Sequence, residues 1–217
     1  MRIALAHGWG CDATLWRQVR RLAPAQFDFH LIDFGYYGDP VLPDKAQPPF
    51  DLAVGHSLGA LWWLTEAPAA WRRLLCINGF ARFSAAPDYP GVAPRLIARM
   101  RKQLAQRPAT VLQDFFDRCA APASWRNAML AATPAPARLD AGLALLAEGD
   151  GRALLQQRRD DIYALASEHD AITPAAMSRA AFAALAPQRL HFSAAPGHLT
   201  PLGDARRCVD LICAVVA

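Results

Sequence analysis

The segment Gly55-His56-Ser57-Leu58-Gly59 constrains the fold of this chain more than any other part of its sequence. It lies between a short apolar run, residues 52–54, and an apolar helix-like stretch, residues 60–64. Glycines two positions either side of the serine let a strand and a helix approach closely, because no Cβ atom separates them. The pattern predicts a nucleophile elbow, in which a strand turns sharply into a helix and a strained serine projects above a sheet.

The elbow falls within a region, residues 2 to 80, that alternates short apolar runs with helix-like stretches. That alternation is typical of a parallel sheet joined by crossover helices. We expect strands at Ile3–Ala6, Phe29–Ile32, Leu52–Val54 and Leu74–Ile77, and helices at Ala13–Leu22 and Leu58–Ala67. The alternation returns later, with strands at Ile162–Ala166 and Leu190–Ser193, a helix at Pro174–Leu185 capped by Thr173, and a last helix near Asp204–Val216.

Residues 82 to about 150 show no apolar run of the kind that a buried strand needs. Helical patterns separated by proline-containing breaks replace it. We interpret this region as a helical lid inserted into an α/β core of residues 1–81 and 151–217. A length of 217 residues suits one domain. The predicted fold class is therefore α/β, with a mostly parallel sheet and one helical insertion.

A serine nucleophile needs a general base, and the base needs a carboxylate to orient it. Among the six histidines, His198 lies in the loop between the last expected strand and the last helix, and we predict it to be the base. His7 is expected to shape its own turn by hydrogen bonding. The remaining histidines are assigned to packing, surface or elbow positions: His30, His56, His169 and His191.

For the carboxylate we favour Asp170, which comes just after the expected strand 162–166. Catalytic groups gather at that edge of an open parallel sheet. Glu168 is the rival, two residues closer to the strand, whereas Asp170 sits in the turn before the helix that Thr173 and Pro174 open. The chain order Ser57, Asp170, His198 is that of α/β-hydrolases.

An oxyanion hole needs two N–H donors aimed at the developing charge. The backbone N–H of Leu58, the residue after the serine, is one candidate. The second is the backbone N–H of Trp9, in the turn His7-Gly8-Trp9-Gly10 after the first expected strand. Its indole would also wall the substrate pocket, unless this segment is only a tight turn with a core tryptophan.

The composition excludes other classes of protein. A formal net charge of +4, dispersed along the chain, does not indicate a nucleic-acid binder. Five cysteines show no disulfide or metal-ligand spacing, which favours a reducing cytoplasm. No signal segment follows Met1, and no run reaches the roughly 18 apolar residues that span a membrane. We expect a cytoplasmic monomer without metal, cofactor or membrane contact.

With these residues the chain resembles the α/β-hydrolase superfamily over nearly its whole length, and more narrowly the pimeloyl-[acyl-carrier protein] methyl ester esterases of biotin synthesis. The narrower resemblance rests on residues 7–10 with 15–16, 32–33 with 35–38, 55–59, 83–85 with 89–92, 170–174 and 197–198. The chain begins at the strand before the oxyanion turn, so we expect the usual first two strands of the family to be missing. A compact esterase of the same pathway, from another branch of the superfamily, remains a second candidate relative.

The resemblance implies hydrolysis of the methyl ester of pimeloyl-[acyl-carrier protein], with the acidic carrier protein as partner. On an expected helix from about Val92 to Arg107, one side is apolar, and the opposite side carries Arg95, Arg99 and Lys102. This basic stripe would attract an acidic carrier, or it is simply a solvated helix face. Trp9, Phe80 and Phe83 are the residues that we expect to line an acyl channel.

Two further functions stay open at this point. One is a general short-chain carboxylesterase or a carbon–carbon bond hydrolase with the same fold. The other is a non-catalytic α/β-hydrolase that binds a ligand or a carrier protein.

Overall fold

A six-stranded parallel sheet forms the centre of the molecule in the computed structural model, which describes residues 1–195 and 197–217. In sheet order the strands are β2 (Asp28–Ile32), β1 (Arg2–Ala6), β3 (Phe50–His56), β4 (Trp71–Ile77), β5 (Ile162–Ser167) and β6 (Leu190–Ser193). Each adjacent pair is parallel. The expected α/β class is confirmed, and all six expected strands are present.

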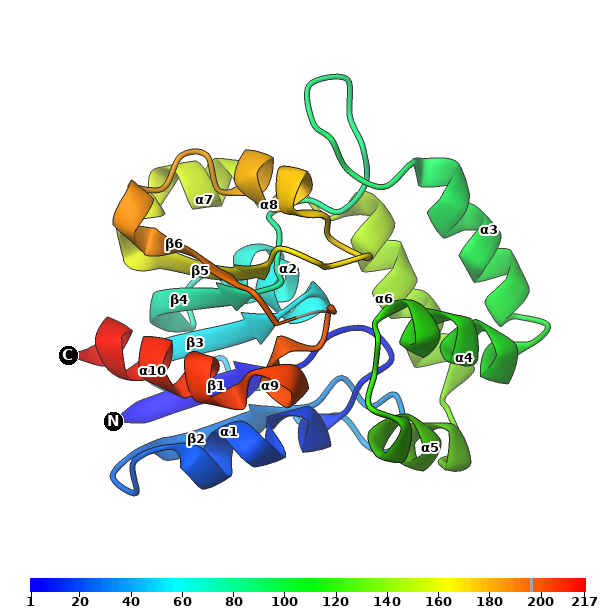
Figure 1. Cartoon of the computed structure of the whole chain (residues 1–217), viewed down its shortest axis with the longest axis horizontal. Coiled ribbons are helices and arrows are strands. Elements are labelled where there is room, and N and C mark those ends of the chain that lie inside the picture. The colour runs from blue at the N-terminus through cyan, green and yellow to red at the C-terminus, as the bar shows by residue number, and fades with distance from the viewer. Residues whose placement is uncertain (196) are drawn as a thin grey trace.

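Helices cover both faces of this sheet (Figure 1). One face packs against α1 (Arg17–Leu22), α9 (Thr200–Gly203) and α10 (Ala205–Val216), and the other against α2 (Leu58–Thr65), α7 (Arg152–Gln157) and α8 (Ala175–Ala181). In β1, Ile3 and Leu5 pack on the face that α1, α9 and α10 cover, whereas Ala4 and Ala6 pack on the opposite face. Because side chains alternate across a strand and both faces are covered, the strands read as unbroken apolar runs.

Two expected helices differ from the structure in detail. The stretch 13–22 is divided into a short 3-10 turn, Ala13–Trp16, and α1. Thr173 does not cap α8, because Pro174 occupies the position directly before the helix; the Thr173 hydroxyl donates a hydrogen bond to the Asp170 carboxylate.

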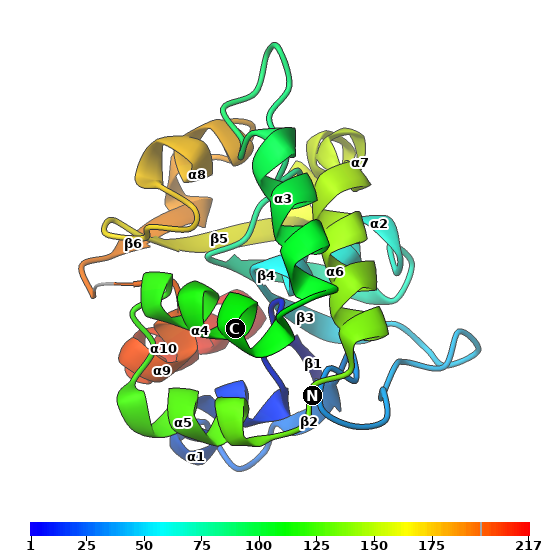
Figure 2. The same ribbon diagram turned by 90° about the vertical axis from the view of Figure 1, so that its right-hand side faces the viewer.

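Four helices lie beyond the carboxyl ends of the strands, and Figure 2 shows them in front of the sheet. They are α3 (Pro94–Leu104), α4 (Pro108–Arg118), α5 (Ala123–Ala131) and α6 (Pro136–Glu148). Proline is the first residue of α3, α4 and α6, a position where its missing N–H costs nothing. The expected helix 92–107 is therefore shorter than predicted, since Pro94 begins it and Pro108 begins the next one.

Candidate active site

Ser57 occupies the sharp turn between β3 and α2. Its φ of 53° lies in the left-handed region, which a non-glycine residue adopts only under constraint. The constraint is close packing: a Cβ on Gly55 would lie 2.4 Å from the backbone N of Ala60, and one on Gly59 would lie 2.5 Å from the carbonyl of Ala6. The predicted elbow geometry is present, and the local sequence imposes it.

His198 and Asp170 meet Ser57 at this edge of the sheet. The Ser57 hydroxyl lies 2.8 Å from His198 Nε2, and His198 Nδ1 lies 2.7 Å from Asp170 Oδ2. A carboxylate only accepts hydrogen bonds, so Nδ1 carries the proton and Nε2 is free to accept from the serine. All three side chains are buried, with His198 at 0% and Ser57 and Asp170 at 5% exposure. The structure thus brings together three residues that are 141 and 28 positions apart in the chain.

Asp170 is held as an anion by its surroundings. Burial acts to raise its pKa, but the charge and hydrogen bond of His198 and two hydrogen bonds from Thr173 outweigh burial and hold that pKa below its usual range. The backbone N–H groups of Ile172 and Thr173 donate to Oδ1 at 2.7 and 2.9 Å. A carboxylate so anchored stays charged and keeps the imidazole in one orientation.

Asn78 is a residue of this site that the sequence did not indicate. It follows β4 with a φ of 46° and is fully buried. Its side-chain amide donates to Asp170 Oδ2 at 2.9 Å, whereas its own Oδ1 has no partner among the described residues. No local motif marks this asparagine, because its partner lies 92 residues further along the chain.

The rival carboxylate, Glu168, points elsewhere. It is exposed and forms an ion pair of 2.8 Å with Arg179. His169 is exposed as well. The geometry therefore places Asp170, and not Glu168, against His198.

The turn at residues 7–10, which is expected to form part of an oxyanion hole, is anchored by two side chains. His7 accepts a hydrogen bond at Nε2 from the Phe34 N–H (3.1 Å), so its Nδ1 is the nitrogen that donates to the Gly8 carbonyl (2.9 Å). The Trp9 indole donates to the carbonyl of Leu139 in α6 at 2.8 Å. Leu58 is the first residue of α2, where backbone N–H groups have no partner within the helix. Leu58 follows Ser57 directly, and Gly8, the residue before Trp9, lies against it: a Cβ on Gly8 would come within 3.0 Å of the Ser57 Cβ.

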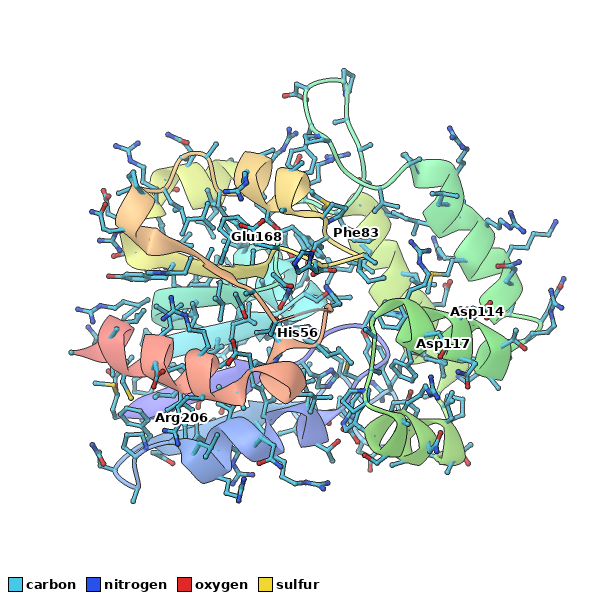
Figure 3. All side chains as sticks on the ribbon, in the orientation of Figure 1. His56, Phe83, Asp114, Asp117, Glu168 and Arg206 are labelled. Carbon is cyan, nitrogen blue, oxygen red and sulfur yellow. The ribbon has the colours of Figure 1, made fainter. Side chains whose placement is uncertain are left out.

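A cavity of about 290 Å³ lies between α3, α4, α6 and the sheet edge. Trp9, Phe83 and Ile172 line it on one side. Side chains of the three helices complete a mostly apolar wall, which also carries Arg99, Gln103, Asp114 and Arg118. Figure 3 shows Phe83 at the sheet edge that faces these helices, and Asp114 and Asp117 on α4. This volume is close to the lower limit for small-molecule pockets.

The lining of this cavity differs from two sequence-based expectations. Phe80 does not line it: the side chain is 1% exposed and packs behind Phe83, with ring centroids 4.8 Å apart. Arg99 does not lie opposite the apolar side of α3, because it lines the cavity together with Leu96, which is 52% exposed. Arg118 of α4 lines the cavity too and was missed, since only the packing of two helices brings it beside Arg99.

Other kinds of site receive no support. In residues 1–195 and 197–217, no cluster of three or more His, Cys, Asp or Glu side chains is placed to hold a metal ion. None of the helices described is both long and apolar enough to cross a bilayer.

Comparison with known proteins defines the class. No protein-family model matches the chain. An esterase from Exiguobacterium antarcticum superposes with a TM-score of 0.78 at 17% identity, covering 100% of this chain and 91% of that one. Together with the elbow and the Ser–His–Asp arrangement, this likeness shows that the chain has the α/β-hydrolase fold.

Curated relatives define the family. The pimeloyl-[acyl-carrier protein] methyl ester esterase of Sodalis glossinidius is 31% identical over 79% of this chain and 76% of its own length. The chain therefore belongs to the family of pimeloyl-[acyl-carrier protein] methyl ester esterases. The biotin biosynthesis bifunctional protein BioHC of Cellvibrio japonicus is 29% identical over 97% of this chain, and the match spans 46% of that longer protein.

Proposed function

We propose that this chain hydrolyses the methyl ester of pimeloyl-[acyl-carrier protein] in biotin synthesis, with Ser57, His198 and Asp170 as its catalytic triad. The observation that carries the chemistry is the continuous pair of short contacts, 2.8 Å from Ser57 to His198 and 2.7 Å from His198 to Asp170. Family membership supports the substrate. The five cysteines, all free thiols, are consistent with a cytoplasmic location.

In this mechanism His198 Nε2 accepts the Ser57 proton as the oxygen attacks the ester carbonyl. The tetrahedral oxyanion receives hydrogen bonds from the backbone N–H groups of Trp9 and Leu58. His198 then returns the proton to the departing methanol, and Asp170 stabilises the imidazolium in between. Water, activated by the same histidine, attacks the acyl-enzyme and frees the carboxylate.

The cavity supports a slender acyl chain as the substrate. Its apolar wall matches methylene groups, and burying each of them is favourable by about 0.8 kcal/mol. Trp9 and Phe83 are the aromatic residues that we assign to acyl binding. In this proposal the helices α3 to α6 act as a lid that holds the chain above Ser57.

The acidic carrier protein would bind outside this lid. Arg95, Arg99 and Lys102 are exposed on α3, and Arg118 is exposed on α4. Of these, Arg99 and Arg118 line the cavity together with one carboxylate, Asp114, so positive charge exceeds negative charge where a carrier-bound chain would enter. Complementary charge of this kind raises the rate of association more than it raises affinity.

The test of the substrate has two arms. In a biotin auxotroph that lacks its own esterase, this chain should restore growth, and Ser57→Ala should not. In vitro the protein should cleave the methyl ester on the carrier protein. Rapid cleavage of short p-nitrophenyl esters without growth rescue would instead indicate a general short-chain carboxylesterase, which the small cavity also fits.

To test whether α3 binds the carrier protein, three of its positive charges are reversed: Arg95, Arg99 and Lys102 are all changed to glutamate. Arg17, Arg20 and Arg21, three exposed arginines of α1, provide a control with the same change in net charge. We expect the α3 variant to lose at least tenfold in kcat/KM for the carrier-bound ester, and to keep its rate on p-nitrophenyl butyrate. Equal losses in both variants would contradict a docking role for the α3 stripe.

A further inference from the structure

His56, the residue directly before Ser57, makes a contact that the proposed mechanism does not use. Its side chain is 1% exposed, at the carboxyl end of β3 (Figure 3). Its Nε2 lies 2.9 Å from the backbone carbonyl of His198, and the two imidazole rings are 5.0 Å apart. The elbow therefore contacts the main chain of the histidine that the mechanism employs as base.

The partner atom decides the protonation of His56. A carbonyl oxygen only accepts, so Nε2 carries the proton and donates it. Nδ1 is then an acceptor, and it has no donor among the described residues. It lies against Gly8, where an added Cβ would come within 2.7 Å of it. A buried nitrogen without a partner lowers stability, so packing by itself does not account for a histidine here.

His56 also stays neutral while its neighbour changes charge. Burial, and then the charge of His198, lower its pKa to about 3. It therefore neither competes with His198 for the proton nor loses its own Nε2–H when His198 becomes charged. The hydrogen bond to the His198 carbonyl is available through the whole catalytic cycle.

The main chain of His198 is held from the opposite direction as well. Its N–H donates to the carbonyl of Cys119 at the end of α4, at 3.1 Å. Gly197 permits that approach, because its φ is +95° and a Cβ there would lie 2.8 Å from the same carbonyl. One peptide segment is thus fixed between the elbow and a helix of the insertion.

We propose that His56 is a positioning residue, which fixes the backbone carbonyl of His198 so that its imidazole meets Ser57 and Asp170 together. Both side-chain contacts of His198 are short, and a shift of about 1 Å would lengthen them beyond useful hydrogen bonds. Misplacement of that size costs about 100-fold in rate. This inference rests on the proposed triad of Ser57, His198 and Asp170.

The test compares variants at one position. His56→Gln keeps an N–H donor near the place of Nε2, whereas His56→Leu has a similar volume and no donor. His56→Asn is polar, but its amide falls short of the carbonyl. Val215→Ala, in buried packing at the far end of α10, controls for loss of stability. Thermal unfolding is recorded for each variant, and kcat and KM are measured with p-nitrophenyl butyrate.

We expect His56→Leu and His56→Asn to lower kcat 10- to 100-fold with KM changed less than about threefold. His56→Gln should retain a third or more of wild-type kcat. The downfield proton resonance of the His198–Asp170 hydrogen bond should persist in the Gln variant and broaden in the other two. The Val215 control should keep its kcat.

Two outcomes would overturn the inference: kcat within twofold of wild type in the Leu and Asn variants, or equal losses in the Gln, Leu and Asn variants. Failure of the proposed function is seen separately. It would show as an inactive wild type, or as an active Ser57→Ala variant, before any His56 variant is compared.

Discussion

Asp170→Asn replaces one carboxylate oxygen with an amide nitrogen. We expect this change to lower the catalytic rate much more than the stability of the fold. Two backbone N–H groups face Oδ1 and cannot turn away, so the amide oxygen of the variant stays with them. The amide nitrogen then takes the place of Oδ2, where it meets three donors: His198, Asn78 and Thr173. Each of these three neighbours must become an acceptor or lose its contact.

The neighbours differ in how they can respond. The Thr173 hydroxyl rotates, and Asn78 turns its amide to present the Oδ1 that has no partner in the native protein. His198 accepts at Nδ1 only by moving its proton to Nε2, which then cannot take the proton of Ser57. We therefore expect a loss of about 1–3 kcal/mol in the free energy of unfolding, because two of three contacts are recovered. The rate should fall far more, by about 10³- to 10⁴-fold in kcat, which is about 4–5.5 kcal/mol in activation free energy.

Steady-state hydrolysis of p-nitrophenyl butyrate and urea unfolding measure the two quantities on the same preparation. Asp204→Asn is the matched control, because Asp204 also binds a hydroxyl, that of Ser193 at 2.7 Å, and its other side-chain hydrogen bond is to the N–H of Arg207, not to a residue of the site. It should lose stability without a comparable loss of kcat. The reasoning is refuted if Asp170→Asn keeps more than about a tenth of wild-type kcat while folded.

Three further outcomes are expected. Trp9→Phe loses the hydrogen bond to the Leu139 carbonyl, so chemical unfolding should report a stability about 1–3 kcal/mol lower. An unchanged midpoint would contradict this. Gly59→Ala places a Cβ 2.5 Å from the Ala6 carbonyl, so fluorophosphonate labelling of the serine should fall at least 100-fold or the protein should not accumulate. Because the pKa of His56 is lowered from 6.5 to about 3, the unfolded state takes up a proton below pH 6.5 that the folded state does not, and stability falls with the pH in that window. The slope, about 1.4 kcal/mol per pH unit, should be absent from urea titrations of His56→Gln; an identical slope in both proteins would exclude this assignment.

Features that depend on a few neighbouring residues could be predicted from the sequence. The elbow at Ser57 follows from two glycines and the flanking strand and helix patterns; the close contact at Gly55 is with Ala60 nearby, whereas that at Gly59 is with the Ala6 carbonyl of β1. The strands followed from apolar runs, and His198 and Asp170 from their places after strands. Parallel strands present their carboxyl ends at one edge, so loops that are distant in the chain converge there.

Contacts between distant segments required the tertiary structure. Asn78 and His56 carry no local signal, because their partners lie 92 and 142 residues away and are met only when the sheet is assembled. Packing of α3 against α4 decided that Arg99 and Arg118 line one cavity, and a ring contact with Phe83 holds Phe80 away from it. Thr173, in contrast, binds a carboxylate only three residues before it, within the turn that leads into α8. Periodicity and turn chemistry act along the chain, whereas the partner of a buried polar group is set by which segments the fold brings together.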